Sequence, residues 1–481
     1  MQQAILTVDL GFGDAGKGSI VDYLTRAHGA HTVVRYNGGA QAGHRVVTAE
    51  AAPRTHVFAQ FGSGALAGAA THLSRFMLLD PLAMMAEAHH LRTLGVSDPF
   101  GLTTIDARAL LITPFQRAVN RLKELARGDG RHGSCGMGIG ETQADALAFG
   151  EQVLRVGDLA HADVVYHKLK FLRAVNLAKA RPLPVDPAAP DQYQAEWEML
   201  AGDDWADWIM PAYADFARRA QIVPGDHLHA ILRRHGSVIF EGAQGVLLDE
   251  WLGFHPHTTW SATTLANARQ LLHEAGYAGR IVRLGITRAY ATRHGAGPLV
   301  SEDARLTQAL PDAANEFGAW QRGFRIGWLD LVMLRYARDV VGALDALAVT
   351  CLDRLAEMPA LHVCQRYQHG STTIERLTPS PRAHDLDYQA GLTQLLGQCR
   401  PILTPVSAAD ELLACLSASL EIPIGLISRG PTAADKQIVE ASVWKPARTG
   451  RAGAARSKAA ANPPGPGRGV FVNSAKRAAA A

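Results

Sequence analysis

The chain has 481 residues, 47% of them hydrophobic, which is enough for one large domain or two to three ordinary ones. The net charge is +3, but the eight Lys or Arg residues after residue 444 are accompanied by no acid, so the rest of the chain carries −5. This mildly acidic body argues against nucleic-acid binding, and no apolar run approaches the roughly 18 residues of a membrane span.

The five cysteines are scattered and form no C-x-x-C motif. This pattern favours reduced thiols over a disulfide framework or a zinc site. The amino terminus also lacks the basic and then apolar pattern of a secretory signal. We therefore expect a cytoplasmic protein that does not interact with a membrane.

Short apolar runs alternate with helical patterns along residues 1–440. Strands are predicted at residues 5–10, 32–36, 237–241, 280–284, 346–350 and 424–427, and helices at 80–94, 114–127, 193–219, 264–275 and 328–341. This alternation predicts an α/β fold with a large, mostly parallel central sheet flanked by helices, in a single large domain with subdomain insertions. Residues 441–481 are instead basic and rich in Ala, Gly and Pro, and we expect a disordered tail.

The first predicted strand leads into a glycine-rich turn and then a helix, an arrangement that points backbone N–H groups at a phosphate. Gly11, Gly16 and Lys17 fit the Walker A pattern G-x-x-x-x-G-K, but Gly18 stands where Ser or Thr would hold magnesium. Asp14 in the turn is the obvious alternative oxygen ligand. The pattern predicts a P-loop-like nucleotide-binding amino terminus, although a plain glycine turn fits it as well.

Further glycine-rich segments lie next to predicted strands. Residues 35–45 form an open glycine loop that ends near His44, and residues 133–140 form another; Gln244 precedes a cluster of hydroxyl residues, and Arg293 lies in a third glycine loop. Glycine lets the backbone approach a ligand closely, and the Arg fork suits a carboxylate or phosphate. Each segment taken alone also fits an ordinary surface loop.

Taken in order, these segments resemble the adenylosuccinate synthetase family from about residue 4 to residue 440. The family's G-D-E-G-K-G corresponds to Gly13-Asp-Ala-Gly-Lys-Gly18, its G-G-H-N-A-G-H to Gly38-Gly-Ala-Gln-Ala-Gly-His44, and its G-T-T-G-R-G-I-G to Gly133-Ser-Cys-Gly-Met-Gly-Ile-Gly140. Further matches are Phe240-Glu-Gly-Ala-Gln-Gly245, Thr292-Arg-His-Gly-Ala-Gly-Pro298, Gly327-Trp-Leu-Asp330 and Ile427-Ser-Arg-Gly-Pro431. So many segments in one order are not expected by chance.

The resemblance implies a GTP-dependent ligase that joins IMP and L-aspartate through a 6-phosphoryl-IMP intermediate, with one Mg²⁺ per subunit. The products would be adenylosuccinate, GDP and phosphate, in the AMP branch of purine nucleotide biosynthesis. Asp14 would take the N1 proton of IMP, while Lys17 and His44 would stand where charge grows on the transferred phosphoryl group. The family also works as a homodimer, and we expect one here.

The resemblance assigns binding residues position by position. It implies GTP contacts for Gly13, Ala15, Gly16, Gly18, Gly43, His44, Asp353, Ser428 and Gly430; IMP contacts for Asp14, Gln41, Cys135, Gln244 and Thr259; aspartate contacts for Thr292, Arg293 and Arg325; and metal contacts for Asp14 and the Gly43 carbonyl.

Several departures from the family pattern fall at ligand positions. Ala15 replaces a Glu, Gln41 an Asn, Cys135 a Thr and Cys351 a Lys that lies along the base, and residues 146–150 lack the Arg that reaches the partner subunit's IMP phosphate. The catalytic set is nevertheless kept. Two alternatives stay open: a paralogue that applies the same chemistry to a different purine nucleotide, amino acid or phosphate donor, and a nucleotide-binding protein without ligase activity.

Overall fold

The computed structural model describes residues 2–444, except for residues 187–188, 313–314, 316–317, 319 and 321–322. Residues 445–481, nearly all of the predicted basic tail, lie outside the described residues. None of the helices in the described part of the chain is long and apolar enough to cross a membrane.

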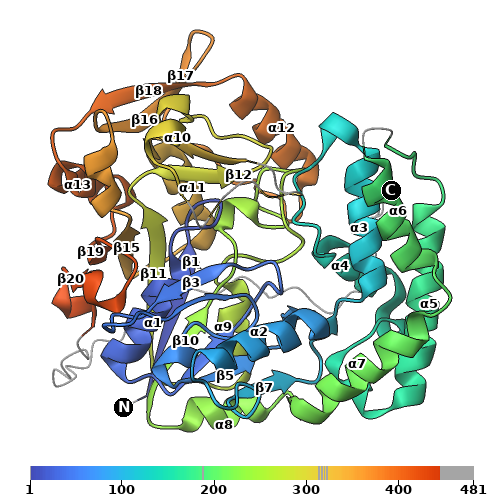
Figure 1. Cartoon of the computed structure of the whole chain (residues 1–481). Coiled ribbons are helices and arrows are strands. Elements are labelled where there is room, and N and C mark those ends of the chain that lie inside the picture. The colour runs from blue at the N-terminus through green and yellow to red at the C-terminus, as the bar shows by residue number, and fades with distance from the viewer. Residues whose placement is uncertain are drawn as a thin grey trace.

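A ten-stranded sheet runs through the centre of the molecule (Figure 1). In spatial order its strands are β20 (Lys436–Ile438), β19 (Ile424–Ser428), β15 (Ala346–Thr350), β11 (Arg280–Arg288), β1 (Gln2–Asp9), β10 (Gly236–Glu241), β2 (Thr32–Arg35), β5 (Ala70–Leu73), β7 (Thr103–Asp106) and β9 (Gln221–Val223). Every neighbouring pair is parallel except β19 and β20. The predicted α/β architecture with a mostly parallel sheet is confirmed.

Helices cover both faces of the sheet, as the burial along β1 requires. Ile5 of β1 packs with Ile20 of α1 (Lys17–His28) on one face. Leu6 points to the opposite face, where the core includes Leu271 of α9 (Ala266–Glu274) and Leu334 of α11 (Leu331–Val341). Successive residues of a strand point to opposite faces, so a strand buried on both sides is apolar almost throughout.

Two groups of elements lie outside the sheet. A helical lobe at the right of Figure 1 has its own core and consists of α3 (Pro114–Ala126), α4 (Ile139–Phe149), α5 (Ala162–Ala180), α6 (Pro190–Ala201) and α7 (Trp205–Arg219), with α2 (Pro81–Thr93) beside it. A small sheet at the top left contains β14 (Leu329–Asp330), β16 (His362–His369), β17 (Thr372–Ile374) and β18 (Arg400–Pro405), near α12 (Leu386–Gly397) and α13 (Ala409–Leu420). These groups correspond to the predicted insertions in one large domain.

Several shorter elements lie outside these sheets and the helical lobe, and α8 (His227–Arg233) precedes β10. The hairpins are β3 (His44–Val47) with β4 (Thr55–Phe58), and β12 (Ala291–His294) with β13 (Phe324–Gly327); β6 (Leu78–Leu79) pairs with β8 (Leu110–Leu111), and α10 (Ala304–Ala309) contacts β13.

Two predicted helices differ from the structure. The single helix predicted at residues 193–219 is wrong, because the chain leaves the helical conformation at Gly202 and begins α7 at Trp205. The helix predicted from residue 328 starts later, at Leu331. Asp330 caps it by accepting hydrogen bonds from the Val332 and Met333 N–H groups.

Candidate active site

Loops at the carboxyl ends of the parallel strands surround a cavity of about 760 Å³. Most of the predicted site residues line it: Gly13, Asp14, Gly16, Lys17, Gly18, Gln41, Gly43, His44, Cys135, Gln244, Thr259, Arg293, Asp353, Ser428 and Gly430. Three predicted residues do not line this cavity. Ala15, which is buried, and Thr292 border a smaller neighbouring cavity, and Arg325 lies in β13.

The turn between β1 and α1 has the backbone geometry of an anion site. Gly13 and Gly16 have φ values of 100° and 82°, and Asp14 has φ 58°, which is uncommon for a residue other than glycine. Gly16 is the N-cap of α1, and no side chain caps this helix. Its first N–H groups have no intrahelical partners and are suited to bind a phosphate.

Gly18 explains the departure from the Walker A pattern. A Cβ at this position would lie 2.7 Å from the carbonyl carbon of His44 and 2.9 Å from the carbonyl oxygen of Arg45. The start of β3 therefore passes too close to α1 for a Ser or Thr. A metal at this site must use other oxygens.

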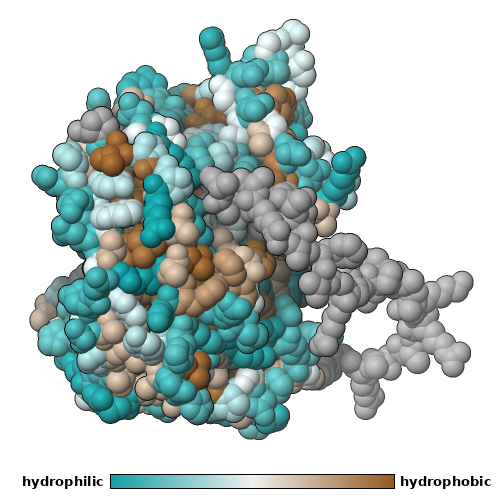
Figure 2. Space-filling model, turned by 90° about the vertical axis from the view of Figure 1, so that its right-hand side faces the viewer, coloured by the Kyte–Doolittle hydropathy of each residue, from teal (hydrophilic) through white to brown (hydrophobic). Residues whose placement is uncertain are grey.

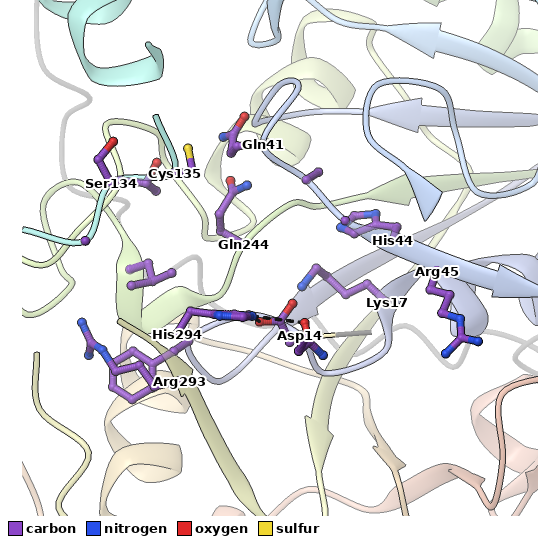
Figure 3. A pocket seen from close by; sticks show the side chains of 18 of the residues that line it. Asp14, Lys17, Gln41, His44, Arg45, Ser134, Cys135, Gln244, Arg293 and His294 are labelled. Atoms are coloured by element: carbon purple, nitrogen blue, oxygen red, sulfur yellow. Dashed lines mark hydrogen bonds and ion pairs between the residues drawn. The ribbon is translucent and has the colours of Figure 1, made fainter. Parts of the chain in front are cut away.

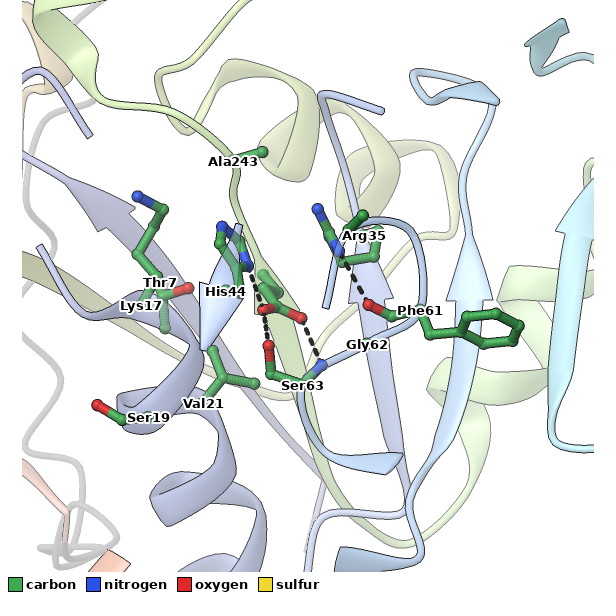
Figure 4. Close-up of polar contacts among 12 residues, drawn as sticks. Thr7, Lys17, Ser19, Val21, Arg35, His44, Phe61, Gly62, Ser63 and Ala243 are labelled. Atoms are coloured by element: carbon green, nitrogen blue, oxygen red, sulfur yellow. Dashed lines mark hydrogen bonds and ion pairs between the residues drawn. The ribbon is translucent and has the colours of Figure 1, made fainter. Parts of the chain in front are cut away.

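His44 is held by a buried acid at the end of β10 (Figure 4). Its Nδ1 donates to Glu241 at 2.6 Å, and Glu241 also accepts hydrogen bonds from the backbone N–H, at 3.0 Å, and the hydroxyl of Ser63. Burial works to raise the pKa of Glu241, but Arg35 and the donors of His44 and Ser63 outweigh it and lower the pKa to about 2. Burial lowers the pKa of His44 although Glu241 opposes this. The imidazole orientation is thus fixed, with Nε2 left for a ligand.

Asp14 lies opposite His294, the last residue of β12 (Figure 3). The His294 Nε2 is 3.6 Å from the Asp14 Oδ2 and 3.1 Å from the Asn315 Oδ1. Asn315 donates to Asp312, and Arg288 bridges from Asp312 to the backbone carbonyl of Asp14. This ring of contacts holds Asp14 in its left-handed conformation with its carboxylate towards the cavity.

Two glutamine amides face the cavity beside Cys135 (Figure 3). Both polar atoms of Gln41 and the Oε1 of Gln244 are buried without a hydrogen-bond partner among the described residues. Buried amides normally have partners, so these atoms are suited to meet a polar ligand. Burial raises the pKa of the Cys135 thiol, which makes it a weak neutral donor.

The glycine loop at residues 133–140 directs its N–H groups inward. Gly133 and Ser134 donate to the buried carboxylate of Glu124 at 3.1 and 3.2 Å. The Gly138 N–H donates to the Asn120 side chain at 3.2 Å, and the Gly136 N–H to the Ser134 hydroxyl. In this arrangement the four N–H groups are not available to a phosphate.

Both arginines predicted to receive aspartate are engaged with the backbone. Arg293 donates to the carbonyls of Ala296, Pro298 and His257. Arg325 donates to the carbonyls of Gly295 and Gly297, and its Nη1 pairs with Glu302 at 2.6 Å. These contacts shape the loop after β12 and use three of the five N–H donors of each guanidinium.

Three further residues predicted to contact GTP, Asp353, Ser428 and Gly430, also line the cavity. The Gly430 carbonyl accepts from the Ser428 hydroxyl at 3.0 Å and from the Lys436 Nζ at 2.8 Å. Burial lowers the pKa of Lys436 to about 8, while Asp435 and other acids oppose this. Asp353 lines the same cavity.

The sequence interpretation did not single out four residues of the site. They are Asp9, which contacts Lys17, and Glu241, Arg288 and His294. Asp9, Glu241 and Arg288 are the last residues of the parallel strands β1, β10 and β11, and His294 ends β12, the short strand that follows β11. That position is itself a signal for a ligand site in a sheet of this kind.

The uncapped start of α1 and the side chains of Asp14, Lys17 and His44 line one cavity at the carboxyl ends of the parallel strands. This fold and this cavity define a nucleotide-binding α/β enzyme. The model of the adenylosuccinate synthetase family matches residues 6–437. The adenylosuccinate synthetase of Gloeobacter violaceus is 32% identical over 92% of this chain and 98% of its own. That of Salinibacter ruber is 34% identical over 87% of this chain and 94% of its own.

Solved structures agree on the fold. A fully ligated adenylosuccinate synthetase from Plasmodium falciparum aligns with a TM-score of 0.71 at 20% identity, over 91% of this chain and 99% of its own. The cyanophage S-2L succinoaminodeoxyadenylate synthetase, bound to dGMP and to dATP as an energy donor, aligns with a TM-score of 0.56 at 16% identity. The alignment covers 91% of this chain and 95% of the cyanophage chain. The chain belongs to the adenylosuccinate synthetase family, and its activity is that of a GTP-dependent ligase of purine biosynthesis.

Proposed function

We propose that this protein joins IMP and L-aspartate, with GTP as phosphoryl donor, to form adenylosuccinate. The observation that carries the proposal is that Asp14, Lys17 and His44 border the same cavity as the open amino terminus of α1. This reaction requires a general base at the purine and hydrogen-bond donors around the γ-phosphate. These residues supply both.

The reaction follows from these roles. Asp14 takes the N1 proton of IMP, the purine O6 attacks the γ-phosphorus of GTP, and the bond to the GDP oxygen breaks. Lys17, the Nε2 side of His44 and the α1 N–H groups stabilise the charge on the transferred phosphoryl group. The amine of aspartate then adds at C6, phosphate leaves with the O6 oxygen, and the amine loses a proton.

The oxygen donors at the site fit Mg²⁺. The Asp14 carboxylate and the Gly43 carbonyl would hold the ion, which neutralises phosphate charge when it is bound. Among the described residues no group of three or more His, Cys, Asp or Glu side chains could form a metal cage. This suits an ion that takes most of its ligands from phosphates and water.

The test is formation of GDP, phosphate and adenylosuccinate from GTP, IMP, L-aspartate and Mg²⁺. Turnover should vanish in Asp14→Ala and persist in Asp163→Ala, a matched control that removes an exposed acid of α5. A folded wild-type protein without turnover on these substrates would refute the proposal. The expected homodimer and the cytoplasmic location stay predictions.

A second candidate is the same chemistry on another purine nucleotide, amino acid or donor. It is favoured by the loop at residues 133–140, whose N–H groups are used internally, and by Cys135 and Gln41 beside it. A competition panel with GMP, dGMP, inosine and ATP, and with other amino acids, separates the two. Stronger turnover with one of these compounds than with IMP, L-aspartate or GTP selects the paralogue. Nucleotide binding without any turnover selects the non-catalytic alternative.

A further inference from the structure

A buried acid lies directly beneath the glycine turn. Asp9, the last residue of β1, is 1% exposed. Its Oδ1 accepts the Gly11 N–H at 2.8 Å, and its Oδ2 accepts the Ala15 N–H at 3.1 Å and the Lys17 Nζ at 2.6 Å. One carboxylate therefore joins both arms of the turn to the lysine that begins α1.

These contacts separate the donors of the turn into two groups. The N–H groups of Gly11 and Ala15 point down to Asp9 and cannot meet a ligand. The first N–H groups of α1 remain open, because Gly16 carries no side-chain cap. Asp9 thus determines which part of the turn is presented to the cavity.

The Lys17 ammonium is held in the same way. Its side chain is 3% exposed but borders the cavity, and Figure 3 shows it directed towards the space beside Asp14. An ammonium has three N–H donors, and Asp9 takes one of them. A buried cation without a counter-charge is unfavourable, so Asp9 keeps Lys17 at a fixed place with donors left for a phosphate.

We propose that Asp9 is a positioning residue for the phosphoryl donor: by pairing with the Lys17 ammonium, it holds this side chain where it receives the terminal phosphate of a nucleoside triphosphate. The role rests on the proposed function, but it concerns donor binding rather than the ligation step. Asp9 does not touch the substrate and acts through Lys17.

Asp9→Asn tests the idea, because an amide has one acceptor oxygen and would turn its NH₂ group towards an N–H or the ammonium. We expect kcat/KM for GTP to fall roughly ten- to hundredfold, as for the loss of one charge-assisted hydrogen bond. The KM values for IMP and L-aspartate should stay within about twofold of the wild-type values, since the substitution leaves the residues predicted to bind these two substrates unchanged. Asp106→Asn is the matched control: Asp106 is also buried at the end of a parallel strand, and it pairs with Arg108 away from the cavity.

A double-mutant cycle with Lys17→Met decides whether Asp9 acts through Lys17. We expect the double variant to lose no more kcat/KM for GTP than Lys17→Met alone, because the interaction is already gone. Losses that multiply, or equal losses for all three substrates, would assign Asp9 a merely structural role and overturn the proposal. If Asp9→Asn does not fold, Asp9→Glu serves the same comparison, since its longer side chain displaces the ammonium.

Direct binding of GTP, measured by calorimetry without IMP or aspartate, separates this proposal from the proposed function. Weaker GTP binding in Asp9→Asn supports the positioning role even if the wild-type protein makes no adenylosuccinate. Wild-type affinity in Asp9→Asn, together with weakened binding in Lys17→Met, would overturn it.

Discussion

Replacing Glu241 with Gln removes the buried anion that holds His44 at the cavity. The carboxylate accepts hydrogen bonds from the His44 Nδ1 and from both the hydroxyl and the N–H of Ser63. Gln offers one acceptor oxygen, so its NH₂ group must face one of these donors. The side chain is fully buried, so the lost contact leaves a buried donor without its acceptor.

The expected loss follows from the pKa of Glu241. Burial favours the neutral acid, but Arg35, His44 and Ser63 together lower the pKa from 4.5 to about 2. At about 1.4 kcal/mol per tenfold change, the ionised form adds roughly 3 kcal/mol to the free energy of unfolding at neutral pH. Because the folded-state pKa is depressed, this stability is present above about pH 4.5 and is lost as the pH falls towards 2.

Urea unfolding at pH 7, 5, 4 and 3 measures the effect. The difference in unfolding free energy between the wild type and Glu241→Gln should be largest at pH 7 and shrink at pH 4 and 3. Glu87→Gln is the control, since Glu87 accepts hydrogen bonds from backbone N–H groups elsewhere. Equal stability at pH 7, or a difference that does not change with pH, would refute the reasoning.

Two further predictions concern packing and pH. Gly18→Ser should destabilise the fold by about 1–3 kcal/mol, because the new Cβ would lie 2.7 Å from the His44 carbonyl carbon. The variant should therefore turn over GTP more slowly and should not bind metal better. An unfolding free energy in urea equal to that of the wild type would contradict this. Burial raises the pKa of Asp330 from 3.8 to about 6, so its ionisation lowers stability by roughly 3 kcal/mol as the pH rises from about 4 to above 6. Asp330→Asn should remove this pH dependence of the unfolding free energy. If the unfolding free energies of the wild type and of Asp330→Asn change with pH in the same way, the reasoning about Asp330 is wrong.

Much of the architecture could be predicted from local patterns. The strand at residues 346–350 and the helix starting at residue 114 agree with β15 and α3, because a run buried on both faces and a capping box are local signals. The helix predicted at residues 193–219 failed, because its apolar periodicity continues across Gly202 while the backbone does not.

The candidate site was predicted as a set of residues but not as a set of available donors. Glycine spacing and the family motifs singled out Asp14, Lys17 and His44, and the structure brings all three to one cavity. The same motifs assigned Arg293 and Arg325 to a substrate, and this assignment stays a prediction; the structure adds that both side chains also donate to loop carbonyls. Which atoms a neighbour already occupies is not visible in a motif.

The sequence by itself determined the alternation of strands and helices and, through the resemblance of its motifs, the family. The alternation follows from a short-range property, the hydrophobic period. Only the tertiary structure decided that Glu241 holds His44 from 197 residues away, and that Arg288 contacts the Asp14 backbone from 274 residues away. Such pairs form because parallel strands bring their carboxyl ends to one edge of the sheet, whatever the distance along the chain.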